Sequence, residues 1–308
     1  MASDRVTIVT VIRETLETTL RFVAWHRAMG ADALRIYFDD PDDPAIPFLE
    51  PLEYVAVIRC APAFWQSIGV ADPGVWRVRQ LAALTDGYRA VAEGWVAVLD
   101  GDELFWFDGR PFQEVLSGMA AEVRSIRVVT AELVFHRTTQ GSITHFRGPV
   151  SLSQCTQIYG LAGFIIRRGN GMAGHRDGKS LTRAGLSLKR MRAHFAVPTR
   201  RSPGTDIVLT QADRAWLLHF VTLGFDHWRG RLERRLRGNG IGLRLKKAIV
   251  TAMDAPLDRE QALRALFDTV HGIDDEQIAR LQMASAYLGL DVDFDAPAKA
   301  LFGPAAAG

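Results

Sequence analysis

Residues 96–105 read VAVLDGDELF. The apolar, largely β-branched first half predicts a buried strand. The strand ends in three carboxylates within four residues, Asp100, Asp102 and Glu103. Burying this much negative charge without a partner is costly, so the cluster predicts a counter-ion. In open α/β sheets, ligands bind outside the carboxyl ends of strands. An Asp-x-Asp pair there can hold a hard divalent cation, which in turn neutralises phosphate groups.

The residues before this cluster alternate between strand and helix patterns. Three further segments read as strands, at 5–12, 33–38 and 54–58, and two read as helices, at 15–29 and 75–92. This alternation predicts a mostly parallel sheet with right-handed crossovers. An acidic loop, Asp39 to Asp43, follows the second strand and would lie at the same sheet edge as Asp100.

The pattern after the cluster is less regular. Residues 125–135 and 158–167 favour strands, and a Gly-rich loop covers 169–178. The best boundary lies between Pro198 and Pro203, and residues from 210 onward read as helical. We therefore expect a Rossmann-like α/β domain over residues 1–200, followed by a helical C-terminal region over 201–308.

Composition is that of an ordinary globular protein. The 308 residues are 48% hydrophobic, and a net charge of +2 gives no strong overall field. Cys60 and Cys155 lie far apart and suggest neither a disulfide framework nor a zinc site. No secretory signal or run of eighteen apolar residues is evident. These features predict a cytoplasmic protein, with attachment to the inner face of the membrane left open.

Two nucleotide-binding motifs are excluded. The sequence VIRET at 11–15 stands where a dinucleotide-binding domain would have its glycine-rich turn. The sequence GHRDGKS at 174–180 has one residue too few between its glycines for a P-loop. Lys179 remains a candidate phosphate contact.

Four stretches together resemble a bacterial branch of the family 2-type glycosyltransferases with the A-type nucleotide-sugar fold. They are VIRE at 11–14, WHRAMG at 25–30, IYFDDPDD at 36–43 and VLDGDEL at 98–104. A looser similarity continues through GKS at 178–180 to MRAHF at 191–195. The chain departs from the family pattern where Arg13 replaces an Asn, Pro41 replaces a Ser, and Phe38-Asp39 replaces an Asp-Asn pair.

The resemblance implies roles for particular residues. Asp100 and Asp102 would bind Mn²⁺ or Mg²⁺ bridging the diphosphate of a nucleotide-sugar, with His194 as a further metal ligand or phosphate contact. Glu14 and Asp39 would face the nucleoside, and Arg79 would approach the donor. The donor-binding residues expected are Arg13, Glu14, Asp39, Arg79, Asp100 and Lys179.

The expected reaction moves a sugar from a nucleotide-diphosphate donor to a glycan or lipid-linked acceptor. Catalysis would involve Asp102, and an inverting enzyme would also need a carboxylate base. Glu132 and Asp177 are the candidates, and the sequence does not choose between them. The departures from the family pattern motivate an alternative, a catalytically silent nucleotide- or glycan-binding protein on the same fold.

Basic residues gather in the C-terminal region. They are Arg229, Arg231, Arg234, Arg235, Arg237, Arg244, Lys246 and Lys247. They form either a solvated helix face or a peripheral contact with anionic lipid or a phosphorylated acceptor. No reader motif or basic platform interleaved with aromatic residues indicates nucleic-acid binding.

Overall fold

The computed structural model describes residues 4–71, 73–138, 141–199, 205–237, 241–255 and 258–303. The chain divides into two compact units, each made of separate segments. Unit 1 comprises Met1–Val128, Gly178–Leu217 and Asp293–Gly308, and unit 2 comprises Val129–Asp177 and Leu218–Val292. The expected boundary at residue 200 falls on residues 200–204, which lie outside the described residues.

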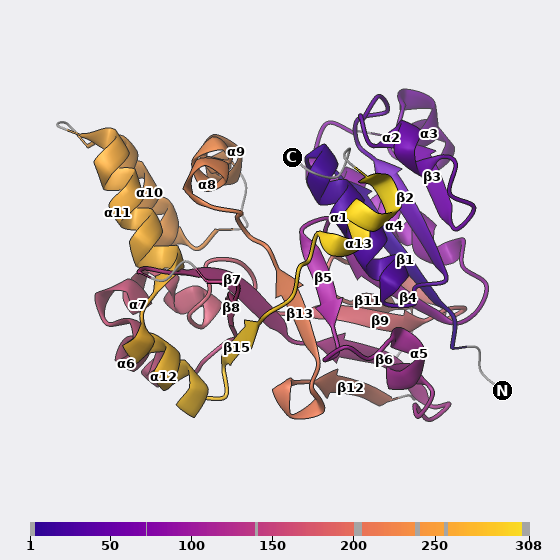
Figure 1. Ribbon diagram of the computed structural model, residues 1–308. Helices are drawn as coiled ribbons and strands as arrows, with labels where there is room; N and C mark the ends of the chain where they lie inside the picture. Colours follow the sequence, from indigo (N-terminus) through magenta and orange to yellow (C-terminus); the bar gives the residue numbers. More distant parts are fainter. Residues whose placement is uncertain are drawn as a thin grey trace. The chain divides into compact units, whose positions relative to one another are not determined.

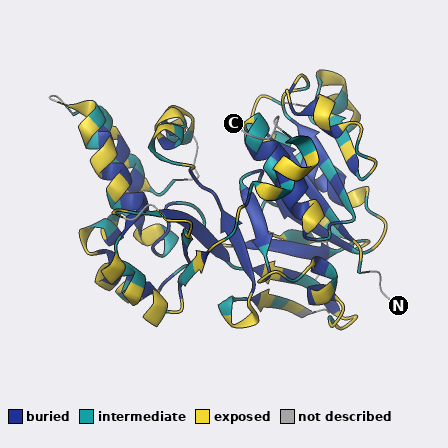
Figure 2. Ribbon diagram, in the orientation of Figure 1, coloured by how far each residue is buried: buried dark blue, intermediate teal, exposed yellow. Residues whose placement is uncertain are grey.

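Unit 1 contains a seven-stranded sheet in the order β12-β6-β9-β4-β1-β2-β3 (Figure 1). The strands are β1 (Val6–Ile12), β2 (Ala33–Phe38), β3 (Val55–Arg59), β4 (Trp95–Leu99), β6 (Val123–Val128), β9 (Lys179–Arg183) and β12 (Thr205–Leu209). Every residue of β4 is buried, as its apolar run predicts. Figure 2 shows the same distribution, with dark blue strands and exposed outer faces on the helices.

The sheet is mixed. β1 pairs in parallel with β2 and β4, β2 pairs in parallel with β3, and β6 pairs in parallel with β12. β9 runs antiparallel to both of its neighbours, β4 and β6. The expectation of a mostly parallel sheet is therefore wrong at β9, and the sheet is mixed. The strand–helix alternation reports only on the first four strands, whereas β9 follows a Gly-rich loop and has no crossover helix to fix its direction.

Helices pack closely on the sheet of unit 1. Helix α1 (Leu16–Ala28) begins at Thr15, whose side chain accepts a hydrogen bond from the Thr18 N–H. Helix α4 (Trp76–Arg89) approaches β1 so closely that a Cβ on Gly87 would lie 2.4 Å from Val9 Cγ1. Helix α13 (Ala296–Phe302) lies beside α1 (Figure 1). Parts of the chain that are far apart in sequence therefore complete one layer.

Smaller elements complete unit 1. They are α2 (Ile46–Leu49), α3 (Pro62–Ser67), β5 (Glu103–Trp106), α5 (Phe112–Leu116), the hairpin of β10 (Leu188–Met191) and β11 (Ala196–Pro198), and the 3-10 turn η2 (Gln211–Asp213). The side chain of His26 is buried beside the Phe22 and Phe105 rings. Its Nδ1 lies 2.8 Å from the Phe22 carbonyl oxygen, so this histidine is a packing residue.

Unit 2 combines a small sheet with a group of helices. Strand β8 (Thr144–Arg147) pairs antiparallel with β7 (Thr130–His136) and β15 (Tyr287–Leu290), and β14 (Gly272–Ile273) pairs in parallel with β7. The helical elements are α6 (Leu152–Tyr159), α7 (Leu161–Ile166), η1 (Arg167–Gly169), α8 (Phe225–Gly230), α9 (Leu232–Arg237), α10 (Leu243–Met253), α11 (Arg259–His271) and α12 (Asp275–Met283). The buried residues Cys155, Trp228, Leu245, Leu263 and Phe267 belong to one apolar core.

Two secondary-structure predictions are wrong. Residues 158–167, predicted as a strand, belong mainly to α6 and α7, because Ser151 and Gln154 form a capping box that starts the helical segment. The helical prediction from residue 210 is confirmed for most of 225–302. It fails at β13 (Trp216–His219), because the Thr210–Asp213 capping box starts only the short turn η2, and it also fails at the short strands β14 and β15.

Neither unit contains a described helix that is both long and apolar enough to cross a bilayer.

Candidate functional site

The carboxyl ends of three adjacent strands carry the predicted donor-binding residues. Arg13 and Glu14 follow β1, Asp39 follows β2, and Asp100 and Asp102 follow β4. Because β2, β1 and β4 are parallel neighbours in that order, these residues come to one edge of the sheet. The chain order reverses between β1 and β4, which is where open α/β sheets form a ligand crevice.

Asp100 is held by two donors from elsewhere in unit 1. Lys179 Nζ lies 2.6 Å from Asp100 Oδ2, and Gln80 Nε2 donates to Asp100 Oδ1 at 2.9 Å. Glu103 Oε2 accepts the Asp100 backbone N–H at 2.8 Å and lies 3.1 Å from Lys179 Nζ. The predicted counter-ion of the acidic cluster therefore includes a lysine of this chain.

Lys179 is completely buried between its two carboxylate partners. Burial alone would lower the pKa of Lys179, but the negative charges of Asp100 and Glu103 raise it above its ordinary value. The lysine is therefore charged at neutral pH. Its position at the start of β9 explains why the buried Glu103 carboxylate is tolerated.

Asp39 is held by a bidentate ion pair. Arg79 Nε lies 2.6 Å from Asp39 Oδ1, and one of its terminal nitrogens donates to Asp39 Oδ2 at 2.8 Å. Arg13 approaches the same carboxylate at 3.8 Å. Arg79 stands on α4 with the Trp76 ring beneath its guanidinium, 5.6 Å from the ring centroid. Helix α4 thus supplies Arg79 to Asp39 and Gln80 to Asp100, and the sequence singled out only Arg79.

The loops after β1 and β4 touch at Gly101. A Cβ at this position would lie 2.8 Å from Ile12 Cδ1 and 3.1 Å from Glu14 Cγ. A glycine between the two aspartates therefore lets the Asp100–Asp102 turn lie against the turn after β1. Asp102 and Glu14 are both half-buried at this contact.

A divalent cation fits the charge of this turn. Asp100, Asp102 and Glu103 are three carboxylates close together in the chain, and Lys179 pairs with Asp100 and Glu103. Carboxylate oxygens are the ligands that Mg²⁺ and Mn²⁺ prefer. Asp100 accepts from Lys179 and Gln80, and ligation of a cation by Asp102 stays a prediction.

His194 lies near the start of β9. Its Nδ1 is 3.0 Å from the Gly178 carbonyl oxygen, and its own carbonyl accepts from Ser180 Oγ at 2.8 Å. In the part of the chain that the structure describes, Asp100, Asp102 and His194 do not form a group with all ligand atoms within 4.8 Å of one another. Metal ligation by His194 stays a prediction.

Glu132 and Asp177, the two candidate bases, belong to unit 2. Glu132 is completely buried, and Arg147 donates to its Oε1 at 2.6 Å. The backbone N–H groups of Ala173 and Gly174 also donate to Glu132, at 2.9 and 2.5 Å. Burial alone would raise the pKa of Glu132, but Arg147, His271 and the Ala173 N–H lower it to about 2. Glu132 thus holds the Gly-rich loop in place, while Asp177 is exposed on that loop.

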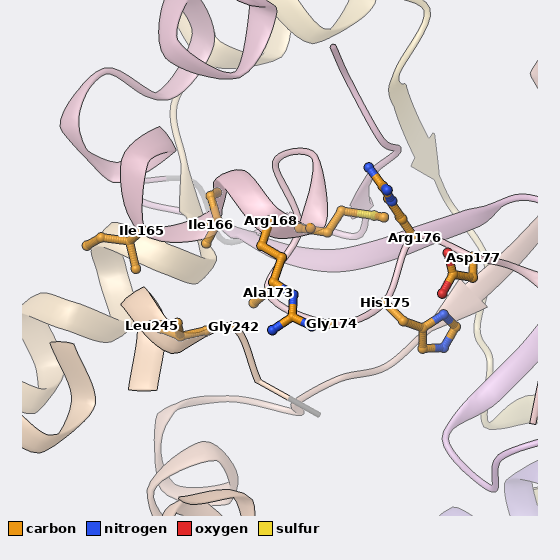
Figure 3. Close-up of a pocket in the computed structure, with 12 residues that line it drawn as sticks. Ile165, Ile166, Arg168, Ala173, Gly174, His175, Arg176, Asp177, Gly242 and Leu245 are labelled. Atoms are coloured by element: carbon orange, nitrogen blue, oxygen red, sulfur yellow. The ribbon is translucent and has the colours of Figure 1, made fainter. Parts of the chain in front are cut away.

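The Gly-rich loop forms one wall of a cavity of about 300 Å³ in unit 2 (Figure 3). The other walls come from α7, η1 and the start of α10. The residues that line it are Ile165, Ile166, Arg168, Gly169, Met172, Ala173, Gly174, His175, Arg176, Asp177, Gly242 and Leu245. The sequence identified the Gly-rich loop and Asp177, but not Arg168 or Arg176.

Comparisons with known proteins leave the family open. No family model matches the chain, and no curated protein matches it. Among solved structures, the crystal structure of HddC from Yersinia pseudotuberculosis aligns with 76% of this chain and 100% of its own, at 9% identity and a TM-score of 0.39. A similarity of this size identifies neither the fold nor the chemistry.

Proposed function

We propose that this protein is a metal-dependent glycosyltransferase that moves a sugar from a nucleotide-diphosphate donor to a glycan or lipid-linked acceptor. Unit 1 would be a Rossmann-like, A-type nucleotide-sugar domain. The observation that carries the proposal is the position of Glu14, Asp39 and Asp102 at one sheet edge, beside the reversal of strand order between β1 and β4. The sequence resemblance supplies the nucleotide-sugar chemistry.

The charged residues at this sheet edge would have different roles in donor binding and catalysis. Asp39, oriented by Arg79, would accept hydrogen bonds from the nucleoside, as a carboxylate after the second strand of a nucleotide-binding unit does. A divalent cation held by Asp100 and Asp102 would stabilise the negative charge of the leaving diphosphate. Lys179 would hold Asp100 in a fixed orientation.

Of the two predicted bases, Asp177 is the more accessible. Its carboxylate is exposed and lines the cavity of unit 2. Glu132 is enclosed, and a pKa of about 2 makes it a weak base. We therefore assign Glu132 the role of positioning the Gly-rich loop on which Asp177 lies.

One observation favours the silent binding protein as an alternative. Both carboxyl oxygens of Asp39 accept from Arg79, and both of Asp100 accept from Lys179 or Gln80. Carboxylates with internal partners can position a nucleotide without supporting turnover. Binding and turnover therefore need separate measurements.

The test is a screen of nucleotide-sugars for thermal stabilisation in the presence of Mn²⁺. A donor at 100 times its Kd stabilises the folded state by about 2.7 kcal/mol. We expect one donor class to do so, and Asp102→Asn to abolish this stabilisation and the release of nucleoside diphosphate. Glu122→Gln, an exposed carboxylate, is the control.

The outcomes separate the two candidates. Stabilisation by a donor with release of nucleoside diphosphate supports the transferase. Stabilisation without turnover over a panel of glycan and lipid-linked acceptors supports the silent binding protein. If no nucleotide stabilises the protein with or without Mn²⁺, both assignments are wrong.

A further inference from the structure

Three large apolar side chains are exposed on unit 2 at α7 and the first turn of α10. Leu161 is 93% exposed, Phe164 55% and Leu243 63%. The two helices pack against each other, and the Arg244 guanidinium lies over the Phe164 ring, 3.6 Å from its centroid. We call Leu161, Phe164 and Leu243 the apolar patch. Exposed apolar groups that gather on one surface mark an interaction site.

The chain around the apolar patch has charge of one sign only. No Asp or Glu occurs in residues 133–176, which include α6, α7 and η1, or in residues 234–253, which include α10. The basic residues next to the patch are Arg167, Arg168, Arg244, Lys246 and Lys247. On the adjacent helix α11, Glu260 is paired with Arg229 and Arg264. The segments that carry the apolar patch are therefore basic, although the whole chain has a net charge of only +2.

The cavity of unit 2 is built from the same two helices. Ile165 and Ile166 of α7 line it, and so does Leu245 of α10 (Figure 3). Its cationic side chains are Arg168 and Arg176. Asp177 is the acidic residue among those that line it, so the full charges in the lining favour an anion.

The loop that carries Arg176 is held in place by hydrogen bonds. The buried Glu132 carboxylate accepts the N–H groups of Ala173 and Gly174, and Arg176 donates to the Asn170 side chain. Glu132 is in turn held by the fully buried Arg147. The cavity wall is therefore an ordered structure before any ligand arrives, which reduces the entropy lost on binding.

We propose that unit 2 binds the surface of a bilayer that contains anionic phospholipid. The apolar patch enters the interfacial region, and the cavity receives a lipid phosphate with Arg168 and Arg176 as its cationic partners. A soluble phosphate compound would explain the arginines but not the exposed Leu161, Phe164 and Leu243. Interfacial binding combines buried apolar area with attraction between basic side chains and anionic lipid, and both elements are present here. The proposal does not depend on sugar transfer.

Co-sedimentation of the full chain with vesicles tests the proposal. We expect binding to phosphatidylcholine vesicles that contain phosphatidylglycerol, weak binding to phosphatidylcholine alone, and release at high salt. The double variant Leu161→Ser/Phe164→Ser removes apolar contact and should weaken binding at least tenfold. Arg168→Ala/Arg176→Ala removes two charges and should weaken it roughly thirtyfold.

Matched controls separate these effects from general changes of the surface. Met283 on α12 is 88% exposed, so Met283→Ser removes an apolar group elsewhere on unit 2. Lys189→Ala/Arg190→Ala removes two exposed charges from β10 of unit 1. Both controls should bind vesicles like the original protein, and circular dichroism should show all four variants folded.

Two results would overturn the proposal. One is vesicle binding that the patch variant retains in full. The other is thermal stabilisation by inorganic phosphate or glycerol phosphate equal to that by anionic vesicles, because the ligand would then be soluble. The glycosyltransferase assay is independent of both, since it uses a soluble donor and Asp102.

Discussion

Lys179 Nζ lies 2.6 Å from Asp100 Oδ2, and the lysine side chain has no exposed surface. A buried ammonium therefore stands at the carboxyl end of β4, at the position where the sequence indicates a need for positive charge. Lys179 is the first residue of β9, the strand that runs antiparallel to both of its neighbours. The antiparallel strand thus contributes directly to the candidate site.

Lys179→Met should destabilise the protein by about 3–5 kcal/mol, because it removes a cation that pairs with the buried Glu103 carboxylate. Urea denaturation measures the change. The double variant Lys179→Met/Glu103→Gln removes the uncompensated charge and should recover part of the loss. Lys189→Met, at an exposed site, is the control. Equal stability of the two single variants would show that Lys179 is not the counter-ion.

Arg79→Lys should weaken nucleotide binding about tenfold, since lysine cannot make the two parallel hydrogen bonds that orient Asp39. Calorimetric titration of the donor found in the screen measures the change. Arg77→Lys alters an exposed arginine of the same helix and should leave the affinity unchanged. If Arg79→Lys binds the donor with the original affinity, Asp39 does not take part in nucleotide binding.

Gly101→Ala should impair donor binding more than stability. The added Cβ would lie 2.8 Å from Ile12 Cδ1 and 3.1 Å from Glu14 Cγ, both atoms of flexible side chains, so the turn can shift at modest cost. The shift displaces Asp102. We expect donor affinity to fall at least tenfold with a melting temperature within a few degrees of the original. Gly118→Ala has nothing within 4 Å of the new Cβ and serves as the control.

His271 should make stability depend on pH. Burial lowers its pKa from 6.5 to about 3, so between these values the unfolded chain binds a proton that the folded chain does not. Stability is therefore greatest above pH 6.5 and falls as the pH drops toward 3. His271→Leu should remove about 1.4 kcal/mol per pH unit from this slope.

Leucine should be tolerated at this position. Among the described residues, neither ring nitrogen of His271 has a hydrogen-bond partner, so no buried group loses one. At neutral pH we expect the free energy of unfolding to change by less than about 1.5 kcal/mol. Denaturant titrations between pH 4 and 7 test the slope, part of which remains because burial also lowers the pKa of His26, to about 4. An unchanged slope would contradict the assignment.

The first half of unit 1 was predictable because its signals are local. The apolar runs that form β1, β2 and β4 can be read without knowledge of their neighbours, and each ends in the polar residues that meet at the sheet edge. The acidic cluster also predicts its need for a counter-ion. Which residue supplies that charge depends on pairing between β4 and β9, and no local pattern specifies that pairing.

The division into units was beyond local reasoning. Unit 2 is assembled from residues 129–177 and 218–292, and its core joins Cys155 to Trp228 and Phe267. A boundary signal such as the segment from Pro198 to Pro203 marks a break in composition, not the path of the chain. Likewise, Arg147 reads as an ordinary residue of a short strand, and only the fold reveals it as the buried partner of Glu132.

Because α13 packs on α1, unit 1 can complete this contact only after α13 has been synthesised. Trp25 of α1 meets Phe294 with ring centroids 5.1 Å apart, and Arg21 pairs with Asp295. At roughly 5–20 residues per second, about 13–55 s separate the synthesis of these two segments. During that interval the first helix emerges with part of its apolar surface uncovered. A segment synthesised much later therefore covers part of α1.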